Sequence, residues 1–156
     1  MGDVLKLSWD NIDFLTQCLA EQIKNRNMQF DCIIALGRGG LIPGANLSYK
    51  LNITNLHNLG ISTRLDDGKY IDTLVYQRPG PDLFNKKSKI LVVDDINDSG
   101  RTFTAVQSIL ESEYNIDNDN VLYASLIKRD GTEFNNNIIS GNILHTTLWL
   151  QFPWDK

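Results

Sequence analysis

The sequence predicts an α/β fold in which a central, mainly parallel sheet is flanked by helices. Short apolar runs, typical of strands buried on both faces, alternate with segments whose apolar residues recur at helical spacing. The two clearest runs each lead through a polar or glycine-rich loop into a helix. Such alternation is typical of parallel strands joined by right-handed crossovers. With 156 residues, 42% of them hydrophobic, we expect a single domain over residues 1–156 with one sizeable core.

The first third of the chain predicts a helix, a strand and a second helix. The first helix, capped by Ser8 or Asp10, should run to about Asn25, because apolar residues recur at helical spacing at Ile12, Leu15, Leu19 and Ile23. Residues 32–36 form a continuous apolar run and should be a buried strand. The second helix is expected over residues 43–51, with Pro43 near its first position, where a missing N–H is tolerated.

The remainder of the chain predicts more strands and one more helix. Strands are expected at residues 53–59, 71–76, 89–93, 121–127 and 143–149, of which 89–93 is the clearest. A helix should run from Arg101 to about Glu113, because its apolar residues fall on one face. The polar, glycine-containing segment 62–70 is interpreted as a flexible loop or hairpin.

The composition argues against several classes of partner. The formal net charge is −4 and no cluster of lysine and arginine stands out, which disfavours a nucleic-acid or anionic-membrane surface. Cys18 and Cys32 are too few for a disulfide framework and indicate a reducing compartment. The first residues lack an apolar signal segment, and no run is long enough to span a bilayer. We therefore expect a soluble, cytoplasmic protein.

The loop after the clearest strand has the chemistry of a site for a phosphorylated ribose. Two adjacent carboxylates, Asp94 and Asp95, end the apolar run, and Asp98 follows shortly after. The residues that lead into the next helix are Ser99, Gly100 and Thr102. Backbone N–H groups at a helix N-terminus favour a phosphate, and glycine permits its close approach. Carboxylates at the strand end suit ribose hydroxyls or a hydrated Mg²⁺.

A purely structural interpretation of this loop is that Asp98 or Ser99 caps the helix while Asp94 and Asp95 face solvent. Capping would explain Asp98 or Ser99 alone. It does not explain three carboxylates at the end of the most apolar strand. The sequence therefore favours a functional loop.

A second loop, residues 36–40, follows the strand at 32–36 and contains three glycines around Arg38. Backbone N–H groups in such a loop can form a concavity for an anion, and Arg38 adds a permanent positive charge. A tight turn with an exposed arginine explains this loop equally well on its own. The loop lacks the third glycine of a dinucleotide fingerprint, and the chain has no P-loop. Because ligands bind beyond the carboxyl ends of parallel strands, we expect both loops to face one site.

Three segments together resemble the type I phosphoribosyltransferases, most closely the bacterial xanthine-guanine enzymes. The phosphoribosyl pyrophosphate (PRPP) motif of that family resembles Val92-Val93-Asp94-Asp95-Ile96-Asn97-Asp98-Ser99-Gly100-Arg101-Thr102. Its pyrophosphate loop resembles Leu36-Gly37-Arg38-Gly39-Gly40-Leu41-Ile42-Pro43-Gly44. Its C-terminal segment resembles Trp149-Leu150-Gln151-Phe152-Pro153-Trp154-Asp155. The resemblance implies the type I phosphoribosyltransferase fold, with a small hood formed by the C-terminal segment, residues 143–156, and the flexible loop at 62–70.

The resemblance implies roles for the residues of the two loops. Asp94 and Asp95 would hold the ribose hydroxyls of PRPP, with Asp95 also near Mg²⁺, and Asp98 would face N7 of a purine as proton donor or acceptor. The 5′-phosphate would be cradled by Asp98, Ser99, Gly100, Arg101 and Thr102. Pyrophosphate would be bound by Gly37, Arg38 and Gly39, with a cis peptide bond at Gly37–Arg38. Arg78 would be a second pyrophosphate arginine, although the segment around it aligns loosely.

The resemblance also implies a purine site. Lys128 would donate to the 6-oxo group, Trp149 would stack on the ring, and Leu150 and Gln151 would offer backbone contacts to the 2-substituent. Alternatively, Lys128 is a surface charge beside Arg129, and Trp149 is a core aromatic, as we expect for Trp154. The family glutamate is replaced here by Gln151 and the glutamine after it by Phe152, and residues 62–87 match the family poorly.

The implied function is purine salvage: transfer of phosphoribosyl from PRPP to guanine, xanthine or hypoxanthine, with Mg²⁺, by a homodimer or homotetramer. A different base, such as adenine or a pyrimidine, is an alternative, but Lys128 and the Trp149 segment suit a 6-oxopurine. A PRPP-sensing regulator without catalysis is another alternative, which a pI near 5.0 disfavours because such a protein should carry a basic surface. The cysteines and histidines lack zinc-ligand spacing, and no Gly-x-Ser-x-Gly segment occurs.

Overall fold

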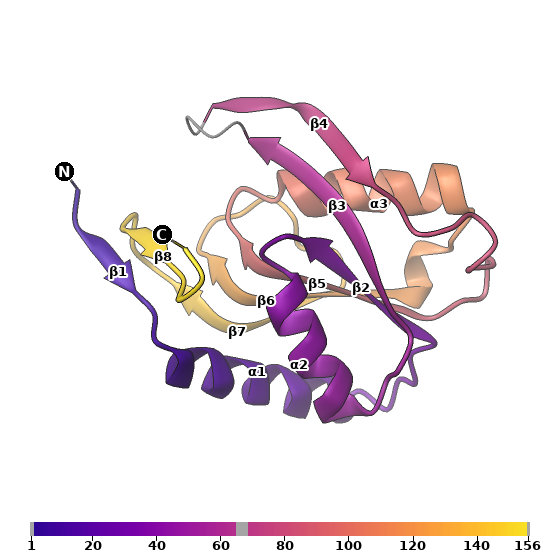
Figure 1. The fold of residues 1–156 in the computed structure, drawn as a ribbon, viewed down its shortest axis with the longest axis horizontal. Coiled ribbons are helices and arrows are strands. Elements are labelled where there is room, and N and C mark those ends of the chain that lie inside the picture. Colours follow the sequence, from indigo (N-terminus) through magenta and orange to yellow (C-terminus); the bar gives the residue numbers. More distant parts are fainter. Residues whose placement is uncertain (1, 65–68, 156) are drawn as a thin grey trace.

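A six-stranded sheet forms the centre of the protein, with helices on both faces (Figure 1). The computed structural model describes residues 2–64 and 69–155. The strand order is β4-β3-β2-β5-β6-β7, and every neighbouring pair is parallel except β3 and β4. The strands are β2 (Cys32–Gly37), β3 (Leu56–Arg64), β4 (Tyr70–Gln77), β5 (Ile90–Asn97), β6 (Val121–Arg129) and β7 (Ile138–Leu144). The predicted α/β fold with a mainly parallel sheet is therefore confirmed.

The helices cover the two faces of this sheet unequally. In Figure 1, α1 (Trp9–Lys24) and α2 (Leu41–Leu51) lie on one side of the sheet, and α3 (Arg101–Tyr114) lies on the other. Side chains alternate along each strand, so Leu91 and Val93 of β5 pack toward α1 and α2, whereas Ile90 and Val92 pack toward α3. This two-sided burial explains why β2 and the first half of β5 are apolar at every position.

The helix boundaries agree with the sequence except at the start of α2. Ser8 caps α1, accepting a hydrogen bond from the backbone N–H of Asn11, as expected. However, α2 begins at Leu41 rather than Pro43. The Gly40 N–H already donates to the Leu36 carbonyl, so the loop winds directly into the helix, and Pro43 is accommodated within the first turn.

The strand predicted at residues 53–59 has different bounds in the structure. The strand predicted at residues 53–59 begins only at Leu56, because Asn52 ends α2 in the left-handed conformation and the Ile53 N–H donates to the Ser48 carbonyl. The same strand continues to Arg64, so residues 62–64 of the predicted flexible loop are part of an antiparallel hairpin with β4. Residues 65–68, the tip of that predicted loop, lie outside the described residues.

The C-terminal region was predicted wrongly as one strand over residues 143–149. The structure instead contains β7, which ends at Leu144, and a short strand β8 (Trp149–Gln151) that pairs in parallel with β1 (Val4–Lys6). β1 and β8 form a separate two-stranded sheet beside the main one (Figure 1). Residues 145–148 leave the main sheet between them. Over the described ranges, no helix combines the length and apolar character required to cross a membrane.

Gly100, at the start of α3, cannot be replaced by another residue without strain. Gly100 adopts φ +86°, in the left-handed region that favours glycine. A Cβ atom there would also lie 2.8 Å from the Phe134 backbone nitrogen. Both the conformation and the packing therefore require glycine at this turn.

We predict that Gly100→Ala destabilises the protein by at least about 2 kcal/mol, because it adds steric overlap to the backbone penalty of the left-handed region. Gly131→Ala is the matched control, since Gly131 has φ +80° but open space around its Cα, and it should lose only about 1 kcal/mol. Urea unfolding measures both variants. Equal losses would contradict the packing of Gly100 against Phe134.

Candidate active site

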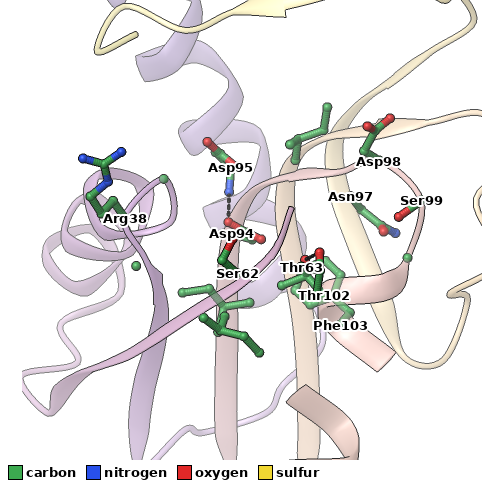
Figure 2. Close-up of a pocket in the computed structure, with 16 residues that line it drawn as sticks. Arg38, Ser62, Thr63, Asp94, Asp95, Asn97, Asp98, Ser99, Thr102 and Phe103 are labelled. Atoms are coloured by element: carbon green, nitrogen blue, oxygen red, sulfur yellow. Dashed lines mark hydrogen bonds between the residues drawn. The ribbon is translucent and has the colours of Figure 1, made fainter. Parts of the chain in front are cut away.

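The two loops singled out in the sequence line one pocket at the carboxyl edge of the sheet. β2 and β5 are adjacent and parallel, so the loops that follow them lie side by side. Figure 2 shows Arg38 on one side of the Asp94–Asp95 pair, with Asp98 and Ser99 on the other. The hairpin strand β3 closes the pocket with Ser62 and Thr63. The full lining comprises Leu36, Gly37, Arg38, Gly39, Ile61, Ser62, Thr63, residues 94–100, Thr102 and Phe103.

Asp94 and Asp95 are half-buried where β5 approaches its end. Burial raises the pKa of Asp94 well above its usual range, and the charge of Asp95 raises it further. Burial also raises the pKa of Asp95 to about 6. The Asp95 backbone N–H donates to Asp94 Oδ1 at 2.9 Å, drawn as the dashed line in Figure 2. Two negative charges brought together here are unfavourable unless a ligand or a cation compensates them.

The loop after β2 is fitted closely against this pair. The Gly37–Arg38 peptide bond is cis, as the resemblance implied. The Tyr76 hydroxyl donates to the Gly37 carbonyl at 2.8 Å and so fixes the loop to β4. A Cβ atom at Gly39 would overlap the Asp95 carboxylate, so only glycine allows this approach. Arg38 is exposed at the pocket, and no ion pair in the described part of the chain involves its guanidinium.

The loop after β5 brings the N-terminus of α3 to the same pocket. The N-cap of α3 is Gly100, without a side-chain cap, and Asp94 and Asp95 are half-buried in the pocket, so the purely structural interpretation of this loop is not supported. Ser99 Oγ accepts a 3.4 Å hydrogen bond from the Arg101 N–H. The hydroxyls of Thr102 and Thr63 are 3.2 Å apart and join α3 to β3 (Figure 2). Hydroxyls and helix N–H groups thus surround one end of the pocket.

Asp98 makes an ion pair that the sequence did not suggest. Its Oδ1 accepts from Arg129 Nε at 2.6 Å, and both side chains are largely buried. Arg129 is the last residue of β6, and from the sequence it was considered only as a surface charge beside Lys128, in the alternative interpretation of that lysine. Because β6 is adjacent to β5, the ends of these strands are close enough for the pair to form.

A second pocket adjoins the first and contains the aromatic residue expected at a base site. Trp149 is 62% exposed, and its ring lines this pocket rather than the core. Trp154, in contrast, stacks on Phe152 with ring centroids 4.9 Å apart, as expected of a core aromatic. Asp95, Ile96 and Asp98 belong to both pockets. The rest of the second pocket consists of Arg129, Leu150, Phe152 and Asp155.

Four of the expected site residues lie outside these two pockets. Lys128 Nζ donates to Asn135 Oδ1 at 2.7 Å and lines neither pocket, because alternation along β6 directs Arg129 toward Asp98 instead. Arg78 pairs with Glu113 at 2.9 Å, near the end of α3 opposite to the pocket. The Gln151 carbonyl accepts from the Leu7 N–H at 2.9 Å and thereby joins β8 to the N-terminal segment. Arg101 lines a neighbouring hollow with Arg129.

Sequence reasoning missed several residues that shape the site. Arg129, Tyr76, Thr63 and Asn97 all line a pocket or hold a loop. Asn97 is 2% exposed, and its Nδ2 donates to Thr132 Oγ1 at 3.2 Å. This hydrogen bond joins the end of β5, just before the loop to α3, to the segment after β6. Only Arg129 carried a usable signal, since a charged residue at the carboxyl end of a buried strand is expected near the ligand edge.

No protein-family model matches the sequence. Among the solved structures similar to this chain, the following three match almost its whole length. A purine phosphoribosyltransferase from Pyrococcus horikoshii has a TM-score of 0.77 at 24% identity, over 99% of this chain and 95% of that one. A xanthine-guanine-hypoxanthine phosphoribosyltransferase from Helicobacter pylori has 0.78 at 18%, over 98% and 94%. A hypothetical protein from Neisseria gonorrhoeae with bound ppGpp has 0.78 at 24%, over 100% and 91%.

The chain has the type I phosphoribosyltransferase fold. The fold inferred from the sequence is thereby confirmed, and the two loops meet at one edge of the sheet as expected. At these identities the likeness shows the fold alone.

The raised pKa values of the carboxylate pair predict a stability effect that depends on pH. Asp95 has a pKa of about 6 in the folded protein and 3.8 as its ordinary value, so the folded state binds more protons between these values and loses stability as pH rises through them. Asp95→Asn should therefore raise the free energy of unfolding by roughly 1–3 kcal/mol above pH 7, and by little below pH 4. Urea unfolding across this range measures the difference.

Asp82→Asn is the control for this experiment, because Asp82 is exposed and makes no contact within the pocket. It should leave the pH profile of stability unchanged. A constant destabilisation by Asp95→Asn at every pH would mean that the buried charge of Asp95 is not what opposes folding.

Proposed function

We propose that the protein is a purine phosphoribosyltransferase, which transfers the 5-phosphoribosyl group of PRPP to a 6-oxopurine and yields a nucleoside 5′-monophosphate and pyrophosphate. The observation that carries the proposal is the composition of one pocket. Asp94 and Asp95 lie between two anion-binding elements, the loop around Arg38 and the N-terminus of α3. PRPP has the matching pattern, a ribose diol between a 5′-phosphate and a pyrophosphate.

Each part of PRPP would meet groups of suitable chemistry. The N–H groups and hydroxyls of residues 98–102 would hold the 5′-phosphate. Asp94 and Asp95 would accept hydrogen bonds from the ribose hydroxyls. The backbone of Gly37 and Gly39 and the guanidinium of Arg38 would receive the pyrophosphate, whose negative charge grows as it leaves the ribose. Because these groups are fixed by β2, β5 and α3, they are positioned before the substrate arrives.

A magnesium ion fits the carboxylate pair. Among residues 2–64 and 69–155, no group of three or more metal-binding side chains occurs. Mg²⁺ in such a setting takes few ligands from the protein and the others from water and phosphate oxygens, and Asp95 is the side chain we expect to face it. When bound with PRPP, the ion would neutralise charge on the pyrophosphate and on the raised-pKa carboxylates.

The base would occupy the second pocket. Trp149 offers an exposed ring for stacking, with Leu150 beside it. Asp98 lines both this pocket and the ribose site, which is where a group that exchanges a proton with the purine has to lie. The similar enzyme from Helicobacter pylori is a xanthine-guanine-hypoxanthine phosphoribosyltransferase, which supports a 6-oxopurine. Lys128 would have to exchange its contact with Asn135 for the 6-oxo group when the base binds.

A base panel tests this function directly. The protein is incubated with PRPP and Mg²⁺ and with guanine, xanthine, hypoxanthine, adenine or uracil in turn, and nucleotide formation is measured. We expect turnover with at least one 6-oxopurine and much less with adenine or uracil. PRPP binding without turnover on any base would contradict the proposal and favour a regulator.

In the same assay, the variant Asp98→Asn tests whether Asp98 transfers a proton to or from the purine. It should lower kcat by about 100-fold, because a proton-transferring side chain contributes at least that factor, while the affinity for PRPP changes little. Asp82→Asn again serves as the exposed control with unchanged kcat. Full activity of Asp98→Asn would remove Asp98 from the proton transfer.

A further inference from the structure

Arg129 uses all three of its guanidinium nitrogens to join two separate parts of the pocket. Nε donates to Asp98 Oδ1 at 2.6 Å, Nη1 donates to the Thr146 carbonyl at 2.6 Å, and Nη2 donates to the Leu148 carbonyl at 2.9 Å. The side chain is only 19% exposed. Charge-assisted hydrogen bonds of this kind are about twice as strong as neutral ones, and the planar fork fixes their directions.

The two partners of Arg129 belong to different halves of the proposed site. Asp98 lies in the loop between β5 and α3, at the phosphate-binding end. Thr146 and Leu148 lie in the segment that leaves the main sheet after β7 and leads directly to Trp149. Arg129, Asp98 and Trp149 all line the same second pocket.

Little else fastens residues 146–148 to the main sheet. Within the described ranges, their recorded hydrogen bonds to β6 all come from Arg129. The Leu148 N–H donates to Thr146 Oγ1 within the segment itself. The neighbouring His145 pairs with Asp130, but both side chains are exposed to water, so this contact is weak. Beyond the segment, β8 pairs with β1 and not with the main sheet, and Leu150 and Phe152 bury their side chains in the core that β5 and β6 share with α1.

We propose that Arg129 is a positioning residue that sets the distance between the Asp98 carboxylate and the Trp149 ring, and thereby the placement of the base. The inference rests on the proposed function. The base must present its edge to Asp98 and its face to Trp149 at the same time. A guanidinium that holds both sides defines this gap. The PRPP site is held by β2, the Asp94–Asp95 pair and the N-terminus of α3, to which Arg129 is hydrogen-bonded only through the Asp98 side chain.

This arrangement predicts a specific kinetic pattern. Loss of Arg129 should raise the KM for the base and lower kcat, because both the ring and the proton-transferring group lose their fixed positions. The Kd for PRPP should change little. Lysine retains the charge next to Asp98 but cannot donate along three fixed directions, so it should restore kcat in part and the KM for the base hardly at all.

The experiment compares Arg129→Gln and Arg129→Lys in the full chain. Loss of a hydrogen bond to a charged group corresponds to about a 10-fold to 100-fold change, so we expect the KM for the preferred base to rise by at least about tenfold in both variants. Hydrogen exchange of the peptide containing residues 145–151 should become faster in both, without any substrate present. Lys50→Gln, which breaks the 3.3 Å ion pair between α2 and Asp13 of α1, is the matched control and should change neither quantity.

The outcomes separate this inference from the proposed function. Unchanged exchange of residues 145–151 in both Arg129 variants would overturn the inference, whatever the activity. Equal increases in the KM for the base and the Kd for PRPP would also overturn it, since they indicate a general structural role. If wild-type protein transfers no purine, the proposed function fails, whereas faster exchange in the variants would still support the link through Arg129.

Discussion

The parallel register of β2, β5 and β6 is the constraint on which the site depends. Because β2 and β5 run in the same direction as neighbours, with Ala35 opposite Val93, their carboxyl ends and the two loops that follow are held at one edge. The β5–β6 register continues to Asn97 and Lys128, so the next residue of β6, Arg129, reaches the same edge. Apolar side chains on both faces fix this register, since a shift by one residue would reverse every side chain of a strand.

Electrostatics then determines what this edge can hold. Burial raises the pKa of both Asp94 and Asp95, and the charge of Asp95 raises the pKa of Asp94 further. On either side lie groups that attract anions, Arg38 on one and the N-terminus of α3 on the other. A ligand that carries hydroxyls or a cation in the middle and phosphates at both ends satisfies all three regions at once. This complementarity distinguishes the pocket from a simple phosphate site.

The parts of the structure that could be predicted from sequence are those with a local signal. The apolar run of β5, the acids after it and the glycines around Arg38 each indicate their role within about ten residues, and the parallel sheet brings them together. The place of Arg129 at the end of β6 indicates the ligand edge, but its partners could not be predicted, because they are distant in sequence and the adjacent Lys128 carries the same signal while facing elsewhere. The pairing of β1 with β8 joins the two ends of the chain, and three-residue strands carry almost no periodic pattern.

The most direct test of the central claim is calorimetric titration of the protein with PRPP and with ribose 5-phosphate, each with Mg²⁺, for the wild type and for Arg38→Ala. If the pocket combines a pyrophosphate loop with a separate ribose-phosphate loop, wild-type protein should bind PRPP more tightly than ribose 5-phosphate. Arg38→Ala should then weaken PRPP binding by about tenfold or more and leave ribose 5-phosphate binding nearly unchanged. Equal affinities of the wild type for both ligands, or equal losses in the variant, would contradict the account.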